Sequence, residues 1–243
     1  MKPLPFKKIY WSKQHGAYIS LIATWIIAGI LTDFNSIHII AIVFLLCGLN
    51  FVELMVEKFY RKSPLSKNKN AWLYIYGVTI IFSGTVLAVY SESFPFIVLA
   101  LVSGSAGYLI LFKARLQKSI LAEWIIFLLI SIAAFIGSQQ VVWPAIGVLA
   151  IFLGSSIFSV KVRLKKISTI PGLLYTAFSV PLLIIYFSFN TFSIVLSLLI
   201  ILKTSGIWLF PKKFKSVSLP KIGMVEAIFQ MLLIFNFYLF YRF

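Results

Sequence analysis

The feature that most constrains this sequence is a series of nine apolar runs, each about as long as a helix that crosses a bilayer. A membrane-spanning helix needs about 20 predominantly apolar residues. Here 61% of the residues are hydrophobic and only 12% are charged, whereas soluble domains carry about 25% charged residues. The sequence therefore predicts an all-α, polytopic membrane protein with about nine transmembrane helices in a single domain, residues 1–243. A basic arm at residues 1–15 precedes helices expected near residues 16–32, 37–57, 71–90, 94–112, 119–137, 142–160, 171–189, 191–210 and 222–241.

The basic side chains alternate strictly with the apolar runs. Twenty of the 22 Lys and Arg residues lie in the N-terminal arm or in the second, fourth, sixth and eighth connections, and the intervening connections contain none. Cytoplasmic loops of membrane proteins carry an excess of Lys and Arg. We therefore predict a multi-pass protein of the cell membrane with a cytoplasmic N-terminus and an external C-terminus. Topology thus explains the net charge of +16, and no nucleic-acid partner, zinc site or nucleophile elbow is expected.

Acidic residues are rare, and four of the six lie near the predicted cytoplasmic ends of helices: Glu53, Glu57, Glu123 and Glu226. An ionisable residue inside the membrane costs about 2.5–3.5 kcal/mol at full depth, so it usually faces a cavity or the bundle interior. On the second predicted helix, Asn50, Glu53 and Glu57 share one face because they are spaced i, i+3 and i+7. This face can offer two carboxylates and an amide to a cation or a polar ligand. For Glu57, an ion pair with Arg61 one turn further is the alternative interpretation.

Three more polar residues lie inside the apolar runs or next to them. Lys203, on the inner half of the eighth predicted helix, either faces a cavity or extends to the nearby membrane interface. Gln14 and His15 open the first predicted helix, where His15 is an interfacial anchor or a ligand. The basic loops around these residues can offer ammonium and guanidinium groups to an anion.

Two segments and the acidic second helix resemble a known family. The segment Lys13-Gln14-His15-Gly16-Ala17 begins the first helix, and Arg61-Lys62-Ser63-Pro64-Leu65 follows the second. Together they resemble the YwiC-like family of bacterial membrane proteins, over most of the chain.

A more distant resemblance is to the UbiA superfamily of intramembrane prenyltransferases. These enzymes have nine helices around a central cavity, and acidic motifs at the ends of helices two and six bind magnesium and an isoprenoid diphosphate. Asn50-x-x-Glu53-x-x-x-Glu57 resembles the first motif, and Tyr108 with Lys113 and Arg115 resembles the basic segment that contacts diphosphate. The second motif should fall within residues 154–163, which contain no acidic residue. The resemblance thus implies a UbiA-like bundle with one Mg²⁺ at Asn50, Glu53 and Glu57.

These observations lead to one functional expectation with an open alternative. The expectation is a polar cavity that faces the cytoplasm and binds an anionic amphiphile such as an isoprenoid diphosphate. The protein would then be a divergent prenyltransferase whose catalytic residues are not assigned. The alternative, favoured by the missing second motif, is a non-catalytic lipid-anion binder, a transporter or an assembly partner in a membrane complex. The expected anion-binding residues are Lys113, Arg115, Lys161, Arg163 and Lys203. Further cavity candidates are Gln14, His15, Tyr108, Glu123 and Glu226, and membrane lipids are the expected surroundings.

Overall fold

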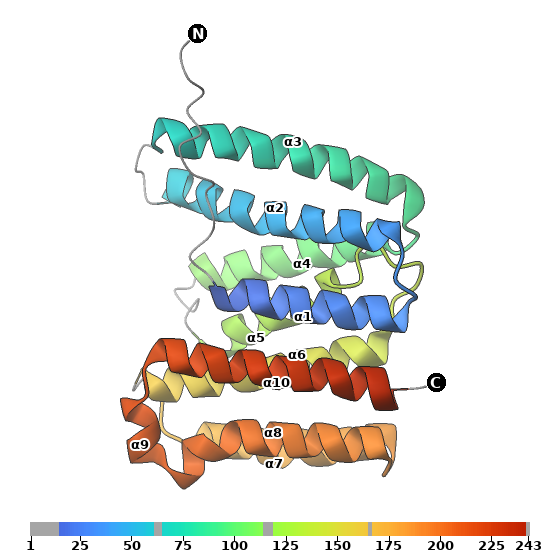
Figure 1. The fold of residues 1–243 in the computed structure, drawn as a ribbon. Coiled ribbons are helices and arrows are strands. Elements are labelled where there is room, and N and C mark those ends of the chain that lie inside the picture. Colours follow the sequence, from blue (N-terminus) through green and yellow to red (C-terminus); the bar gives the residue numbers. More distant parts are fainter. Residues whose placement is uncertain (1–14, 61–64, 114–118, 165–166, 242–243) are drawn as a thin grey trace.

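The computed structural model describes residues 15–60, 65–113, 119–164 and 167–241, which form a bundle of antiparallel helices (Figure 1). In chain order the helices are α1 (His15–Leu31), α2 (Ser36–Tyr60), α3 (Lys67–Tyr90), α4 (Phe94–Lys113), α5 (Ile120–Ala133), α6 (Trp143–Arg163), α7 (Ile170–Phe187), α8 (Thr191–Leu209), α9 (Pro211–Ser216) and α10 (Leu219–Phe240). The described ranges contain no β-strand. The all-α architecture expected from the sequence is therefore confirmed, with the six-residue α9 inserted before the last long helix.

Six of the described helices are long and apolar enough to cross a membrane, namely α2, α3, α6, α7, α8 and α10. Shorter apolar stretches form α1, α4 and α5. Large apolar side chains are exposed on the outside of the bundle, and on α3 Tyr74, Ile81 and Phe82 are each more than 70% exposed. Such a surface is stable in lipid but not in water. The multi-pass membrane character is confirmed.

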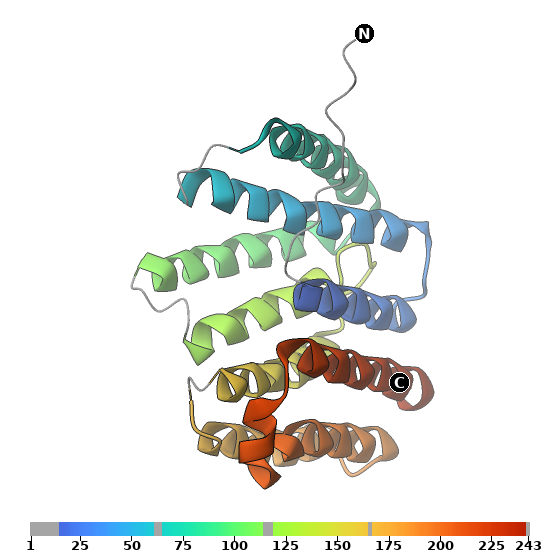
Figure 2. The same cartoon turned by 60° about the vertical axis from the view of Figure 1, so that its left-hand side comes forward.

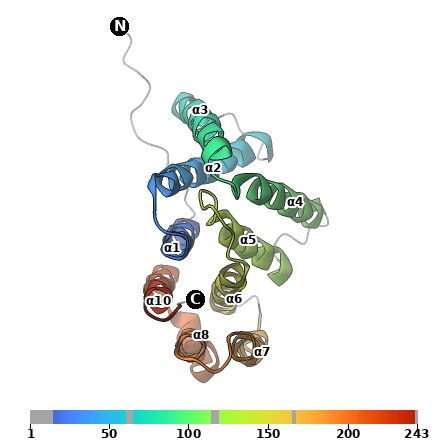
Figure 3. The same cartoon turned by 90° about the vertical axis from the view of Figure 1, so that its right-hand side faces the viewer.

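Helix α6 is the centre of the bundle. Its membrane span is 83% buried, whereas the other five candidate spans are 22–50% buried. It packs against α5, α7, α8 and α10, as the end-on view shows (Figure 3). Small residues permit this close packing, because a Cβ atom at Gly154 would lie 2.6 Å from Nε1 of Trp124. Polar groups on α6 are consequently held inside the protein.

Helices that are distant in sequence lie side by side in the bundle. The first helix, α1, packs along the last, α10, and also contacts α2 and α5 (Figures 1 and 3). Helices α2 and α3 form one end of the assembly and α7 and α8 the other (Figure 2). The α2–α3 pair has its own small apolar cluster, which includes Leu54, Leu73 and Tyr76.

Two helix boundaries show how local chemistry ends a span. The expected division between the seventh and eighth helices lies at Asn190, whose side chain accepts a hydrogen bond from the backbone N–H of Ser193 and caps α8. Helix α5 ends at Ala133 rather than near residue 137. The chain turns there through Gly137, whose φ of +96° is strained for any residue with a Cβ atom.

Candidate functional site

A buried ion pair joins α8 to α10 beside the central helix. Nζ of Lys203 lies 2.9 Å from Oε2 of Glu226, and the two side chains are 1% and 14% exposed. Lys203 also donates hydrogen bonds to the carbonyl oxygen of Phe152 (3.0 Å) and to Oγ of Ser156 (2.8 Å). Its ammonium lies 4.2 Å from the centroid of the Phe152 ring, a cation–π contact. Lys203 therefore points into the bundle, and the alternative in which it extends to the membrane interface is not observed.

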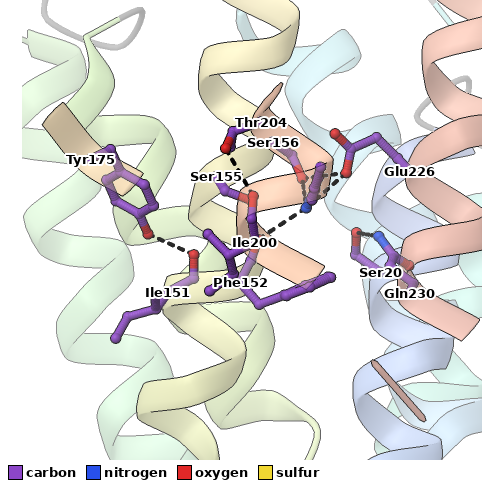
Figure 4. Close-up of polar contacts among 11 residues, drawn as sticks. Ser20, Ile151, Phe152, Ser155, Ser156, Tyr175, Ile200, Thr204, Glu226 and Gln230 are labelled. Carbon is purple, nitrogen blue, oxygen red and sulfur yellow. Dashed lines mark hydrogen bonds and ion pairs between the residues drawn. The ribbon is translucent and has the colours of Figure 1, made fainter. Parts of the chain in front are cut away.

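The helical repeat positions the polar groups of α10. Ile222, Glu226 and Gln230 follow each other at intervals of four residues and so share one face. The Ser156 hydroxyl donates a hydrogen bond to Oε2 of Glu226 at 2.7 Å, which connects α10 to α6. One turn further along α10, Nε2 of Gln230 donates to Oγ of Ser20 on α1 at 3.0 Å (Figure 4). The polar face of α10 thus bridges α1, α6 and α8.

Gln230 has one buried group that is not satisfied. The residue is 4% exposed, and its Oε1 atom has no hydrogen-bond partner among the described residues. A buried acceptor without a donor costs about 1–3 kcal/mol. Gln230 therefore keeps one buried acceptor available on the same helical face as Glu226.

A cavity of about 290 Å³ adjoins these polar residues, between α1, α5, α6 and α10. Its polar lining consists of Ser20, Ser156, Glu226 and Gln230. The other lining residues are apolar or glycine: Ala17, Ile19, Ile126, Phe127, Ile130, Val160, Ile222, Gly223 and Ala227. The cavity is therefore amphipathic, and it lies in the half of the bundle where α1 and α10 begin.

The expected metal ligands on α2 lie elsewhere. Asn50 is buried, accepts a hydrogen bond from the Tyr18 hydroxyl at 2.6 Å and donates to the carbonyl oxygen of Leu46. Glu57 forms an ion pair with Lys69 of α3 at 2.5 Å. Its suggested partner Arg61 lies outside the described residues. None of Asn50, Glu53 and Glu57 lines the cavity.

Two of the three side chains expected to bind Mg²⁺, Asn50 and Glu57, already have protein partners for an oxygen atom. Mg²⁺ requires near-octahedral oxygen coordination, usually with carboxylates. No group of three or more His, Cys, Asp or Glu side chains that could hold a metal occurs in the described ranges, and Lys69 already neutralises Glu57. We therefore derive no metal-dependent step, and Mg²⁺ binding stays a prediction.

The remaining expected site residues divide into those with internal partners and those that are not described. Lys161 of α6 pairs with Glu123 of α5 at 3.0 Å. Arg163 donates from Nε to the carbonyl oxygen of Val217. Two candidates lie outside the described residues, Gln14 and Arg115, and three have no described side chain: His15, Tyr108 and Lys113.

The ion pairs Lys161–Glu123 and Lys69–Glu57 differ in burial, and this difference leads to a prediction. Lys161 is 5% exposed and its partner Glu123 is 33% exposed, whereas Lys69 and Glu57 are 31% and 21% exposed, so only the first pair contains a fully buried charge. A partly exposed pair contributes about 1 kcal/mol or less, whereas a buried group that loses its partner costs about 1–3 kcal/mol. Glu123→Gln is therefore expected to lower the free energy of unfolding by about 1–3 kcal/mol and Glu57→Gln by about 1 kcal/mol or less. Thermal unfolding in a non-ionic detergent measures both, and equal effects would contradict the assignment.

Sequence reasoning singled out Lys203 and Glu226 but not their shared contacts. Ser20 and Ser156 were not among the expected site residues, because serine is common in transmembrane helices and gives no specific signal. The usable signal was the spacing of Glu226 and Gln230, which places a carboxylate and an amide on one helical face.

Comparison with known proteins identifies the family. The model of the YwiC-like protein family matches residues 11–138, just over half of the chain, from before α1 to the turn after α5. No curated protein and no solved structure matches the chain, so the resemblance to the UbiA superfamily stays a prediction. The chain belongs to the YwiC-like family.

Proposed function

We propose that this membrane protein binds an anionic amphiphile in the cavity between α1, α5, α6 and α10, with Lys203 as the counter-ion of its head group. The observation that carries the proposal is that Glu226, which lines an otherwise largely apolar cavity, forms an ion pair with Lys203, which lies buried directly behind it. Ionisable residues within membrane spans are expensive and mark ligand or ion pathways. A buried ion pair also adds little stability compared with an apolar pair of similar volume.

The shape of the cavity supports an amphiphile. Its volume lies at the lower end of the range for small-molecule sites, so it accommodates a head group and the first part of an apolar chain. Ile19 and Val160 line the cavity and are each 38% exposed. The cavity is therefore partly open at these two side chains, and the rest of the ligand's apolar chain can leave it there.

The charge distribution favours an anion. Basic residues with described side chains gather at the end of the bundle where α2 and α6 end and α3 and α10 begin (Figure 1): Lys58, Lys67, Lys69, Lys161, Arg163, Lys212 and Lys221. Lys221 is exposed and precedes the cavity residue Ile222. Such a surface raises the local concentration of anions, and basic residues near a membrane attract anionic lipids by about 1 kcal/mol each. By the positive-inside rule this end is cytoplasmic, with the C-terminus external, and we propose the cell membrane as the location.

The experiment is thermal unfolding of the detergent-solubilised protein with geranylgeranyl diphosphate. Geranylgeraniol, which has the same chain without the charge, is the ligand control. A ligand at about 100 times its dissociation constant stabilises the folded state by about 2.7 kcal/mol. We expect a shift with the diphosphate that is lost in Lys203→Gln/Glu226→Gln. It should persist in Glu57→Gln/Lys69→Gln, which removes an ion pair outside the cavity.

Two outcomes would contradict the proposal. A shift that requires magnesium and disappears in Glu53→Gln would locate the diphosphate on α2, as in the prenyltransferase hypothesis. Equal shifts with the diphosphate and with geranylgeraniol would show that the anion makes no contribution. Stabilisation by the diphosphate without magnesium supports the binding function proposed above.

A further inference from the structure

We infer that the anionic head group enters by displacing Glu226 from Lys203, and that Glu226 takes up one proton from the aqueous phase for each ligand bound. The inference rests on the proposed function and deepens it, because it couples occupation of the cavity to proton uptake. No covalent bond changes. The proton joins the carboxylate, and the charge of the ligand replaces that of Glu226 beside Lys203.

The ammonium of Lys203 has no hydrogen left to donate. It carries three N–H donors. They are used by Oε2 of Glu226 at 2.9 Å, the carbonyl oxygen of Phe152 at 3.0 Å and Oγ of Ser156 at 2.8 Å. An anion can bind Lys203 only if one of these acceptors leaves.

Of the three acceptors bound to Lys203, the Glu226 carboxylate is the one that can leave. The Phe152 carbonyl belongs to the backbone of α6, and Ser156 is a short side chain one turn further on the same helix. Both are held by the most buried helix of the bundle. Glu226 has the longer, more flexible side chain, lines the cavity and is 14% exposed. The carboxylate is therefore the exchangeable partner of Lys203.

Once displaced from Lys203, the Glu226 carboxylate would carry an unpaired negative charge. A carboxylate without a cation is strongly disfavoured in an apolar interior, and it binds a proton instead. Among the described residues, the groups that face Glu226 are Lys203 of α8, the Ser156 hydroxyl of α6, Ser20 of α1 and Gln230 of α10, and the cavity residues of α5 are apolar. Lys161 cannot serve as a substitute cation, because it pairs with Glu123. Protonation of Glu226 is therefore the available way to neutralise it.

The unsatisfied amide of Gln230 independently supports this state. Side chains four residues apart on a helix are neighbours, and Glu226 and Gln230 project from α10 in this way (Figure 4). Both line the cavity. Oε1 of Gln230 has no hydrogen-bond partner in the described part of the chain. A protonated carboxyl group is a donor, whereas a carboxylate is not. Gln230 thus supplies an acceptor that only the protonated form of Glu226 can use.

The test measures proton uptake by titration calorimetry with geranylgeranyl diphosphate, without magnesium, in buffers of different ionisation enthalpy. The measurement is made near pH 8, above the last phosphate ionisation at about 6. We expect the wild type to take up one proton more per ligand than Glu226→Gln, which cannot be protonated. Because binding and protonation are linked, the affinity of the variant relative to the wild type should rise about tenfold per pH unit. A merely structural role of Glu226 would lower the affinity of the variant at every pH.

The outcomes separate the inference from the proposed function. Binding to the wild type with no proton uptake overturns the inference and leaves the proposed function intact. Absence of binding to the wild type at every pH overturns the proposed function itself. Should Glu226→Gln fail to fold, the proton count of the wild type decides the question alone, with Gln230→Leu as a second variant. That variant keeps the ion pair but removes the acceptor for protonated Glu226, so binding should weaken severalfold.

Discussion

Replacing Lys203 with methionine is expected to lower the free energy of unfolding by about 3–5 kcal/mol. The substitution preserves the apolar stem but leaves Glu226 without a cation, and removal of one partner from a buried ion pair has a cost of this size. For a chain of this length, 1 kcal/mol corresponds to about 2–4 °C in Tm. Thermal unfolding in detergent should therefore show a decrease of about 10 °C. The loss should exceed that of any other single-charge removal considered above.

The double variant Lys203→Met/Glu226→Leu is the matched control. Replacing both members of a buried ion pair with apolar residues is often neutral or stabilising, so most of the lost stability should return. If the single variant unfolds at the same temperature as the wild type, Glu226 reaches water and the site is not buried as described. If the double variant is as unstable as the single one, the stability comes from packing around Phe152 rather than from the charge pair.

Gly137→Ala is the second substitution with a large expected effect, a loss of about 2–5 kcal/mol in unfolding free energy. Gly137 has a φ of +96°, and an added Cβ atom would lie 2.7 Å from Cβ of Ala41 and 3.2 Å from the backbone oxygen of Ile37. Strained backbone conformations cost about 1–3 kcal/mol, and overpacking adds about 1–3 kcal/mol. The turn after α5 cannot move away easily, because Phe135 and Ile136 are fully buried beside it.

Gly48→Ala is the control, since a Cβ atom at Gly48 meets nothing within 4 Å. Alanine is favoured over glycine inside a helix by about 1 kcal/mol, so this variant should be as stable as the wild type or slightly more stable. Chemical or thermal unfolding of the two variants in the same detergent makes the comparison. Equal stability of both variants would show that the turn does not require the left-handed conformation.

The spans of this protein could be predicted from the sequence because the requirement that produces them is local. Each run of apolar residues must satisfy its own backbone hydrogen bonds in lipid, and a helix does so within the run. Even the division at Asn190 followed from a side chain that caps the next residues of the same segment. The end of α5 is the exception to this local control. There the turn at Gly137 passes close to Ala41 and Ile37 of α2, so its position depends on another helix.

Partners across helices could not be derived in the same way. The face of Asn50, Glu53 and Glu57 was evident from spacing, but Glu57 pairs with Lys69 of α3 and Asn50 bonds to Tyr18 of α1. These contacts depend on which helices are neighbours, and an apolar surface that faces lipid differs little in sequence from one that faces another helix.

The sequence by itself determined the membrane-spanning helices, the alternation of basic loops and the presence of ionisable residues within membrane spans, where they are energetically unfavourable. Each of these features follows from the free energy of one segment in lipid or at its surface. Only the tertiary structure decided that Lys203 meets Glu226 and Ser156, and that the cavity lies between α1, α5, α6 and α10. Lys203 is 23 positions from Glu226 and 47 from Ser156, and the hydrogen-bonded cavity residues Ser20 and Gln230 are 210 positions apart. These contacts exist because α8 and α10 pack against each other and against α6, and because α1 packs against α10. No local rule of sequence specifies that arrangement.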